Sequence, residues 1–353
     1  MRSMRPVTVL MLAAALGGCT SFGPRTVSYQ QADYAAALAD AAKRQALLNV
    51  VKLRYGDVPS FVTVNQILAG YSVQGTFSVG TELLTGGSLR LTDDANLGVG
   101  GTFTNSPTVT YAPITGAAFA RTFLQPLAPA DLFGLMVSSA PAELVLGLGL
   151  HSFGPYNNER TAVDAQLPAD PGFVEVLALI LELQRAGRLP VDLSTRTTER
   201  FATVRIGHGD TDQAPERRLR RLLSLPEDRD TFEVVYSLGT AAPGKIPIRT
   251  RSLLEVLNQL AADVEVPAAD LRDGRTERGD DGLRTTALPH LHVRHGFLEP
   301  GDAFAAVSYD GDWFWIDNRD LASKRVFSFV LLLLSLSDSS RPGQGPLITI
   351  PAG

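Results

Sequence analysis

Two hydrophobic periods follow one another along the first third of the chain, and this change constrains the fold more than any other feature. Between Tyr29 and Tyr55 apolar residues recur every three or four positions, which predicts a long helix. From Ser60 to Tyr111 they recur every two positions, which predicts strands joined by Gly, Asn and Asp turns. A chain that carries both periods is neither all-helical nor all-strand.

The rest of the chain repeats this mixture. Helical patterns cover residues 115–124, 129–139, 170–186, 252–262 and 319–336. Strand patterns cover residues 201–206, 232–238, 290–295, 303–309, 312–316 and 347–350. Residues 143–153 are apolar with two glycines, and their period does not decide between helix and strand. The sequence therefore predicts an α+β fold, with a mixed or antiparallel sheet packed against helices.

Charge and cysteine content exclude several classes of protein. The 353 residues carry a formal net charge of -5, so there is no overall positive field to hold a nucleic-acid backbone. A single cysteine excludes a disulfide framework and any multi-cysteine zinc or iron–sulfur site. We therefore expect neither a nucleic-acid partner nor a cofactor.

The N-terminus has the pattern of a secretory signal. Arg2 and Arg5 precede the uncharged apolar run Val7 to Leu16, which is too short for a permanent membrane helix. The run ends in Leu16-Gly17-Gly18-Cys19, which resembles the lipobox of bacterial lipoprotein precursors, although Gly17 stands where that family more often has Ala or Ser. An ordinary cleaved signal with a coincidental cysteine is the alternative.

The lipobox resemblance implies a processed and anchored protein. It implies cleavage before Cys19, diacylglycerol on the Cys19 thiol and acylation, for example with palmitate, of the new amino terminus. Several acyl chains give stable anchoring where one chain does not. In that family a residue other than Asp after the cysteine, here Thr20, implies transport to the outer membrane. We therefore expect attachment to the periplasmic face of the cell outer membrane.

The expected organisation has four parts. Residues 1–18 form the signal peptide, 19–28 a lipid-anchored tether, 29–160 the long helix with a strand-rich region, and 161–353 a C-terminal α+β region. The boundary is drawn where Gly, Pro, Asn and Asp cluster in residues 157–171. Residues 45–57 and 107–116 resemble stretches of proteobacterial envelope lipoproteins, and this resemblance implies no particular activity.

Three histidines within six residues are the first candidate for chemistry. His290, His292 and His295 superficially resemble the His-x-His-x-Asp-His motif of metallo-β-lactamase-like hydrolases, but Arg294 replaces the Asp. No nucleophile elbow, phosphate loop or zincin motif is present. A solvated strand is the favoured interpretation, so we assign no catalytic or metal residue and expect the protein not to be an enzyme.

Trp313 and Trp315 are the second candidate. If Asp310-Gly311 is a two-residue hairpin turn, Trp313 lies opposite Ser308 and Trp315 opposite Ala306, which places both indoles on one face. That face could bind a peptide or a glycan. Packing of the last helix over the two rings is the favoured alternative.

A basic segment and an alternating segment remain. Residues 217–221 include four arginines, which predicts a contact with anionic lipid headgroups or an exposed helix. The exposed helix is the favoured interpretation, with Glu216, Glu227 and Asp228 balancing the arginine charges. Residues 71–79 and 97–103 alternate apolar and polar positions over the length that a membrane strand needs. One chain has too few such strands to enclose a pore, whereas several copies have enough. A soluble sheet with one buried face gives the same alternation.

Three functions are therefore carried forward. The leading hypothesis is a non-enzymatic lipoprotein that acts as an accessory, scaffold or assembly factor for an envelope complex and binds an envelope protein partner. The alternative is a homo-oligomeric outer-membrane channel or secretion component to which each copy contributes strands from residues 71–103. An envelope hydrolase is the third.

Overall fold

The computed structural model shows an α+β fold, as the sequence predicts. It describes residues 24–68, 71–79, 97–105, 108–138, 140–162, 165–196, 199–211, 214–239, 243–277, 288–339 and 347–349. The chain divides into two compact units: unit 1 comprises Met1–Pro59 and Ala120–Leu336, and unit 2 comprises Ser60–Phe119 and Ser337–Gly353. The predicted signal peptide and Cys19 lie outside the described residues.

A six-stranded sheet forms the centre of unit 1. Its strand order is β6-β5-β12-β11-β10-β9, with β11 and β12 parallel and the other neighbours antiparallel. The strands are β5 (Leu150–Phe153), β6 (Tyr156–Asn157), β9 (Val191–Arg196), β10 (Glu199–Arg205), β11 (Thr231–Tyr236) and β12 (Lys245–Thr250). Ala202, Val234 and Ile246 stand side by side on neighbouring strands and are all buried. One face of this sheet is therefore apolar.

Helices cover that apolar face. They are α4 (Pro129–Val137), which contacts β9, β10 and β11, α5 (Ala142–Gly149), and α6 (Pro171–Arg185), which contacts β5 and β6. The undecided segment 143–153 is helix α5 followed directly by strand β5. A methyl group on Gly149 would lie 2.9 Å from a Leu132 methyl carbon, so glycine is what lets α5 approach α4 this closely.

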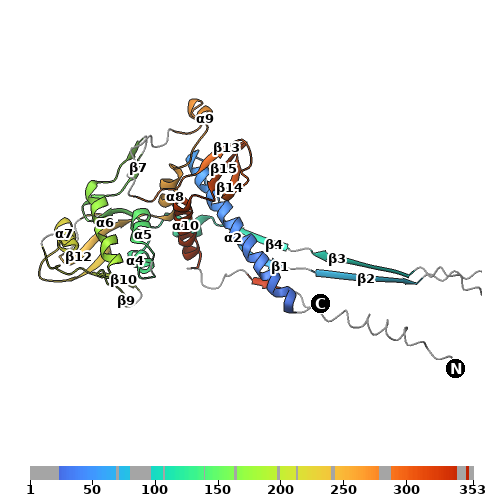
Figure 1. Ribbon diagram of the computed structural model, residues 1–353, viewed down its shortest axis with the longest axis horizontal. Coiled ribbons are helices and arrows are strands. Elements are labelled where there is room, and N and C mark those ends of the chain that lie inside the picture. The colour runs from blue at the N-terminus through green and yellow to red at the C-terminus, as the bar shows by residue number, and fades with distance from the viewer. Residues whose placement is uncertain are drawn as a thin grey trace, which may run out of the picture. The chain divides into compact units, whose positions relative to one another are not determined.

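A second layer of unit 1 combines the long N-terminal helix with a small sheet. Helix α2 (Pro24–Arg54) packs on the three-stranded sheet β13-β15-β14, and Figure 1 shows it beside these strands. The strands are β13 (Arg294–Gly296), β14 (Ala303–Tyr309) and β15 (Asp312–Asp317). This layer also contains helices α8 (Leu253–Ala261), α9 (Ala268–Arg272) and α10 (Leu321–Ser339). The ring of Phe304 on β14 packs edge-on against the ring of Phe327 on α10.

The hairpin and the helix cap predicted from short motifs are confirmed. Asp310 and Gly311 both have positive φ, at 49° and 93°, as a type I′ turn requires. Ser308 pairs with Trp313 and Ala306 with Trp315, the predicted register. At the start of α8, the predicted capping box is present in both directions.

Unit 2 is made mostly of strands. Strand β1 (Val62–Leu68) pairs with β4 (Thr108–Pro113), and β2 (Tyr71–Val79) pairs with β3 (Leu97–Asn105). The chain therefore runs out through β1 and β2 and returns through β3 and β4 as one nested hairpin. Strand β16 (Leu347–Thr349) adds to β1 in parallel, and the short helix α3 (Gly116–Phe119) follows β4.

The remaining described elements are short. A π-helical turn (Ala120–Leu124) precedes α4, β7 (Arg160–Ala162) pairs with β8 (Ala165–Leu167), and α7 (Pro215–Leu222) lies between β10 and β11. Two expectations differ from the structure. The strand expected over 290–295 is only β13, and the boundary expected near residues 157–171 falls inside unit 1, because β5 pairs with the distant β12.

Candidate functional site

The β2–β3 hairpin is the part of the chain whose residue pattern departs most from an ordinary soluble domain. Its two strands are nine residues long each and pair without interruption from Tyr71 opposite Asn105 to Val79 opposite Leu97. Among the described strands, β2 and β3 pair only with one another. An isolated two-stranded sheet is at best marginally stable in water.

The register sorts the residue types of this hairpin into two classes. The positions of one class are apolar or glycine except at Asn105, and they run Tyr71–Asn105, Val73–Phe103, Gly75–Gly101, Phe77–Val99 and Val79–Leu97. The positions of the other class are small or uncharged polar, and they run Ser72–Thr104, Gln74–Thr102, Thr76–Gly100 and Ser78–Gly98. Because alternate positions of a strand belong to opposite faces, one face of the hairpin is apolar in composition and the other polar.

Charges are almost absent from this region of the sequence. Between Val58 and Ala120 the only charged residues are Glu82, Arg90, Asp93 and Asp94. All four fall between the last residue of β2 and the first residue of β3. The paired strands therefore contain no charged residue, and every charge belongs to the connection at the tip.

Strand β4, next to this hairpin in unit 2, carries apolar side chains that nothing in the described residues covers. Val109 is 36% exposed and Tyr111 is 59% exposed. Every side chain of β4 but one is exposed. The apolar side chains of β4 thus do not form a buried face in the way that those of the six-stranded sheet do.

Trp313 and Trp315 lie on the less buried face of β15. The fully buried residues of this strand are Phe314 and Ile316, which alternate with the two tryptophans. The Tyr55 ring of α2 packs edge-on against Phe314, at 6.1 Å between centroids. The sequence favoured a helix packed over the two indoles. In the structure, however, the fully buried face of β15 carries Phe314 and Ile316, and the indoles belong to the other face.

The indoles are bordered by apolar residues that are open to solvent. A methyl group on Gly296 would lie 3.2 Å from the Trp315 ring, so this ring reaches over the neighbouring strand β13. Directly after Gly296, Phe297 and Leu298 are each 83% exposed. Trp313 and Trp315 with these two residues form what we call the tryptophan face.

Two of the three histidines, His292 and His295, share one carboxylate, and His290 has a different one. His292 Nε2 lies 2.6 Å from Glu265 Oε1, His295 Nδ1 lies 3.8 Å from the other oxygen of Glu265, and His290 pairs with Asp263. Only His295 belongs to a strand. In the part of the chain that the structure describes, no group of three or more His, Cys, Asp or Glu side chains is placed to hold a metal ion.

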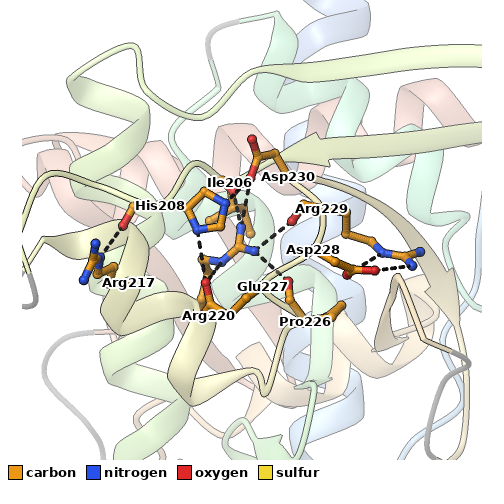
Figure 2. A network of polar contacts seen from close by, with 9 residues as sticks. All are labelled: Ile206, His208, Arg217, Arg220, Pro226, Glu227, Asp228, Arg229 and Asp230. Carbon is orange, nitrogen blue, oxygen red and sulfur yellow. Dashed lines mark hydrogen bonds and ion pairs between the residues drawn. The ribbon is translucent and has the colours of Figure 1, made fainter.

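Helix α7 contains a buried arginine where the sequence favoured an exposed basic helix. Arg220 is 1% exposed and donates hydrogen bonds to the carbonyl oxygens of Ile206 at 2.6 Å, Pro226 at 2.6 Å and Arg229 at 2.7 Å. Figure 2 shows its guanidinium enclosed by these carbonyls. Its Cζ lies 5.4 Å from the centre of the Phe232 ring. Arg220 therefore holds the loop after α7 rather than meeting solvent.

Two other arginines of α7 also have partners. Arg217 donates to the His208 carbonyl at 2.9 Å, as Figure 2 shows, and Arg218 forms an ion pair with Glu175 on α6. Glu216 is buried as well and pairs with Arg188 at 2.5 Å. The structure thus gives α7 a role in packing, and the headgroup interpretation gains no support from it.

A second buried arginine, Arg251, and the contact between His151 and Glu255 stabilise the start of α8. Arg251 is 2% exposed and donates to the carbonyls of Gly147 and Leu148; burial lowers its pKa to about 10. His151 Nε2 lies 3.0 Å from Glu255 Oε1, and burial lowers the pKa of His151 despite this contact. These groups tie β5 to α8.

No family model, curated protein or solved structure matches this chain. Within the described residues, none of the helices combines the length and the apolarity that a membrane crossing requires.

Sequence reasoning found the hairpin but missed the strongest signal in it. The alternation of apolar and polar residues over 71–79 and 97–103 predicts the two strands, but it does not predict that the second strand continues to Asn105. The sequence alone shows that all four charged residues between residues 58 and 120 fall between the two strands of the hairpin. The burial of Arg220 had no such signal, because its partners are backbone carbonyls.

Proposed function

We propose that the protein is an outer-membrane lipoprotein, anchored through Cys19, that forms a homo-oligomeric channel by inserting one β2–β3 hairpin per copy into the bilayer. The observation that carries this proposal is the uncharged, two-faced hairpin, whose apolar positions pair with apolar positions along nearly its whole length. A strand that faces lipid on one side and water on the other has this composition.

The length of the strands fits the thickness of a bilayer. Nine residues at about 3.3 Å each extend about 30 Å, and a tilted membrane strand needs 9–11 residues. The charged residues Glu82, Arg90, Asp93 and Asp94 would then emerge together beyond the apolar band. A crossing hairpin with a charged tip needs no charged group within the hydrocarbon.

The need for several copies follows from the open edges of the hairpin. Backbone N–H and C=O groups must be hydrogen-bonded inside a bilayer, because no water is present to pair with them. Among the described strands, the outer edges of β2 and β3 have no partner. Neighbouring copies of the same hairpin would satisfy both edges, which makes a ring of identical subunits the simplest assembly.

The native mass of the full lipidated protein in mild detergent tests this proposal. We expect a ring of one component for the natural chain and a monomer when residues 71–105 are replaced by an Asp-Gly turn that joins β1 to β4. Trp313→Ala is the matched control and should leave the ring intact. A natural chain that is monomeric, or a ring that survives the deletion, would contradict the proposal.

Cys19→Ser tests the anchor separately. The lipobox resemblance predicts that this variant folds but leaves the outer-membrane fraction, because no acyl chain holds it there. Membrane fractionation with circular dichroism of the recovered protein measures both properties. Normal retention of folded Cys19→Ser in the outer membrane would overturn the lipid-anchor part of the proposal.

The tryptophan face favours a second function, the accessory or scaffold role. Exposed apolar side chains such as those of Phe297 and Leu298, which follow the strand that approaches the half-buried Trp315, are typical of protein-binding sites. In this case an envelope protein would co-purify with the natural chain, and Trp313→Ser with Phe297→Ser would release it while leaving the native mass of any ring unchanged. A defined complex that persists in this double variant would exclude the tryptophan face as its binding surface.

A further inference from the structure

A cavity of about 540 Å³ lies in unit 1, well away in sequence from the hairpin of unit 2. It is bordered by the β5–β6 turn, the start of β12, the segment after β11 and the loop 223–226 after α7. Cavities of roughly 300–1,000 Å³ are the size that small ligands occupy. Strand β12 lines the cavity with Lys245, Ile246, Pro247 and Arg249, of which Ile246 is buried.

The charges around this cavity are of one sign. Its described lining residues include two bases, Lys245 and Arg249, and no acid. Lys245 already has a carboxylate partner, since its Nζ lies 3.2 Å from Glu233 Oε1. Arg249 differs, because its buried Nε has no hydrogen-bond partner.

Arg249 lies in a different setting from Arg220 and Arg251, the two arginines of unit 1 that are fully buried. Arg220 and Arg251 each donate to several backbone carbonyls. Arg249 stands opposite Ser152 of β5, within the wall of a cavity rather than within a cage of carbonyls. A buried N–H group without an acceptor is costly, and an anion that accepts a hydrogen bond from the Arg249 Nε removes that cost.

The remaining wall combines apolar residues with a few uncharged polar ones. Leu223 and Leu225 line it from the loop after α7, Leu238 lines it from the segment after β11 and is 75% exposed, and Pro247 lines it from β12. Polar groups on the same wall come from Ser152 and from Asn157 of β6. An acid group at Arg249 with an apolar body against the leucines would match this distribution.

The wall on the α7 side is held in place before any ligand binds. Arg220 donates to the carbonyl of Pro226, which itself lines the cavity, and to the carbonyl of Arg229 three residues further on, as Figure 2 shows. A wall fixed in this way does not lose conformational entropy when a ligand binds.

We infer that this cavity binds a small amphiphilic carboxylate, whose acid group pairs with Arg249 and whose apolar chain lies along Leu223, Leu225 and Leu238. The site is independent of the channel proposal, since it lies in unit 1 and uses no residue of the hairpin.

Hexanoate is a suitable probe, because its short chain stays in water, and hexanamide is its uncharged match. Saturation-transfer NMR on the full lipidated protein in nanodiscs, with empty nanodiscs as the blank, should detect hexanoate and give at least tenfold weaker binding of hexanamide. Arg249→Met should weaken hexanoate binding at least tenfold and leave hexanamide binding unchanged. Arg205→Met, which removes an exposed cation from the same sheet, should change neither.

The thermal midpoint of the same variants checks that folding is intact. Arg249→Met should unfold at the same temperature as the natural chain or higher, because it removes a buried N–H group that lacks an acceptor. Equal binding of hexanoate and hexanamide, undiminished hexanoate binding by Arg249→Met, or no binding of hexanoate to the natural chain would each overturn the inference. None of these results bears on the native mass that tests the channel.

Discussion

The six-stranded sheet of unit 1 and strand β4 of unit 2 differ in how far their apolar side chains are buried. In unit 1, alternate positions such as Ala202, Val234 and Ile246 are buried under helices α4 to α6. In unit 2, β4 leaves Val109 and Tyr111 open, and among the described helices none packs on β2 or β3 to a comparable degree. The apolar positions of the six-stranded sheet are covered by helices of the same chain, whereas the described apolar side chains of β4 are exposed.

The edges of the two regions differ in the same sense. The edge strand β9 carries Asp192 and Arg196 with nearly all its side chains exposed, and the opposite edge strand β6 is only two residues long. Charges and short edges prevent sheets from joining edge to edge. Strands β2 and β3 are long and uncharged, so their edges have no such protection. The difference is what the proposed association of hairpins from several copies requires.

The largest effect should come from opening the buried network of unit 1. Arg220→Met leaves the carbonyls of Ile206, Pro226 and Arg229 without a donor, so we expect a loss on the order of 3–5 kcal/mol in the free energy of unfolding. Arg218→Met, on the same helix, removes only an exposed ion pair with Glu175 and should change the free energy of unfolding little. Denaturant titration of both variants measures the difference.

A similar loss in the two variants would show that the Arg220 network does not stabilise unit 1. It would also weaken the contrast between unit 1 and the hairpin, because that contrast assumes that the buried contacts of unit 1 stabilise it.

An intermediate effect should distinguish the two faces of the hairpin. Phe77→Arg places a charge in the apolar class of positions, and an arginine facing lipid at mid-depth costs about 2–4 kcal/mol. Thr76→Arg places the same charge one residue away, in the polar class. In planar bilayers we expect Phe77→Arg to abolish channel formation and Thr76→Arg to retain it with a shift towards anion selectivity.

The unfolding of unit 1 should be unchanged in both hairpin variants, which circular dichroism checks. If Thr76→Arg abolishes conductance as fully as Phe77→Arg, the assignment of the polar class to a water-filled lumen is wrong.

The smallest effect should come from the capping box of α8. Burial raises the pKa of Glu255, but hydrogen bonds from His151 and Ser252 outweigh it and bring this pKa below its ordinary value. A carboxyl whose pKa is lower in the folded state contributes stability at neutral pH, and this contribution is lost as the pH falls through the folded pKa. Glu255→Gln should therefore cost about 1 kcal/mol at pH 7 and nothing further in acid.

Urea unfolding at pH 7 and at pH 3 measures this effect, with Glu182→Gln on the exposed side of α6 as the control. The gap between the natural chain and Glu255→Gln should be present at pH 7 and smaller at pH 3. A gap that widens in acid would contradict the assigned direction of the pKa.

Local chemistry made part of this fold predictable. Asp310-Gly311 specifies a tight turn because both residues tolerate positive φ, and that turn sets the register that pairs Trp313 with Ser308. Ser252 and Glu255 specify the start of α8 because their hydrogen bonds close within three residues. These features need no knowledge of distant parts of the chain.

Features that depend on distant contacts were not predictable in this way. The sequence Arg217 to Arg221 is typical of an exposed helix, and only the carbonyls gathered by the fold around Arg220 make its burial favourable. The face of β15 that is buried depends on where α2 packs, so the position of the tryptophans stayed undecided. The unmatched Nε of Arg249 likewise exists only because β5, β12 and the loop after α7 meet.

The central claim is that the apolar positions of the hairpin contact lipid, and fluorescence quenching measures this most directly. Single cysteines at Val73, Gln74, Thr76 and Phe77 would be labelled with bimane in the lipidated protein reconstituted in liposomes, where the only natural cysteine, Cys19, is expected to be blocked by its lipid. Nitroxide-labelled lipids should quench the label at positions 73 and 77 strongly and at positions 74 and 76 weakly. Equal quenching at all four positions, or none at any, would contradict the account.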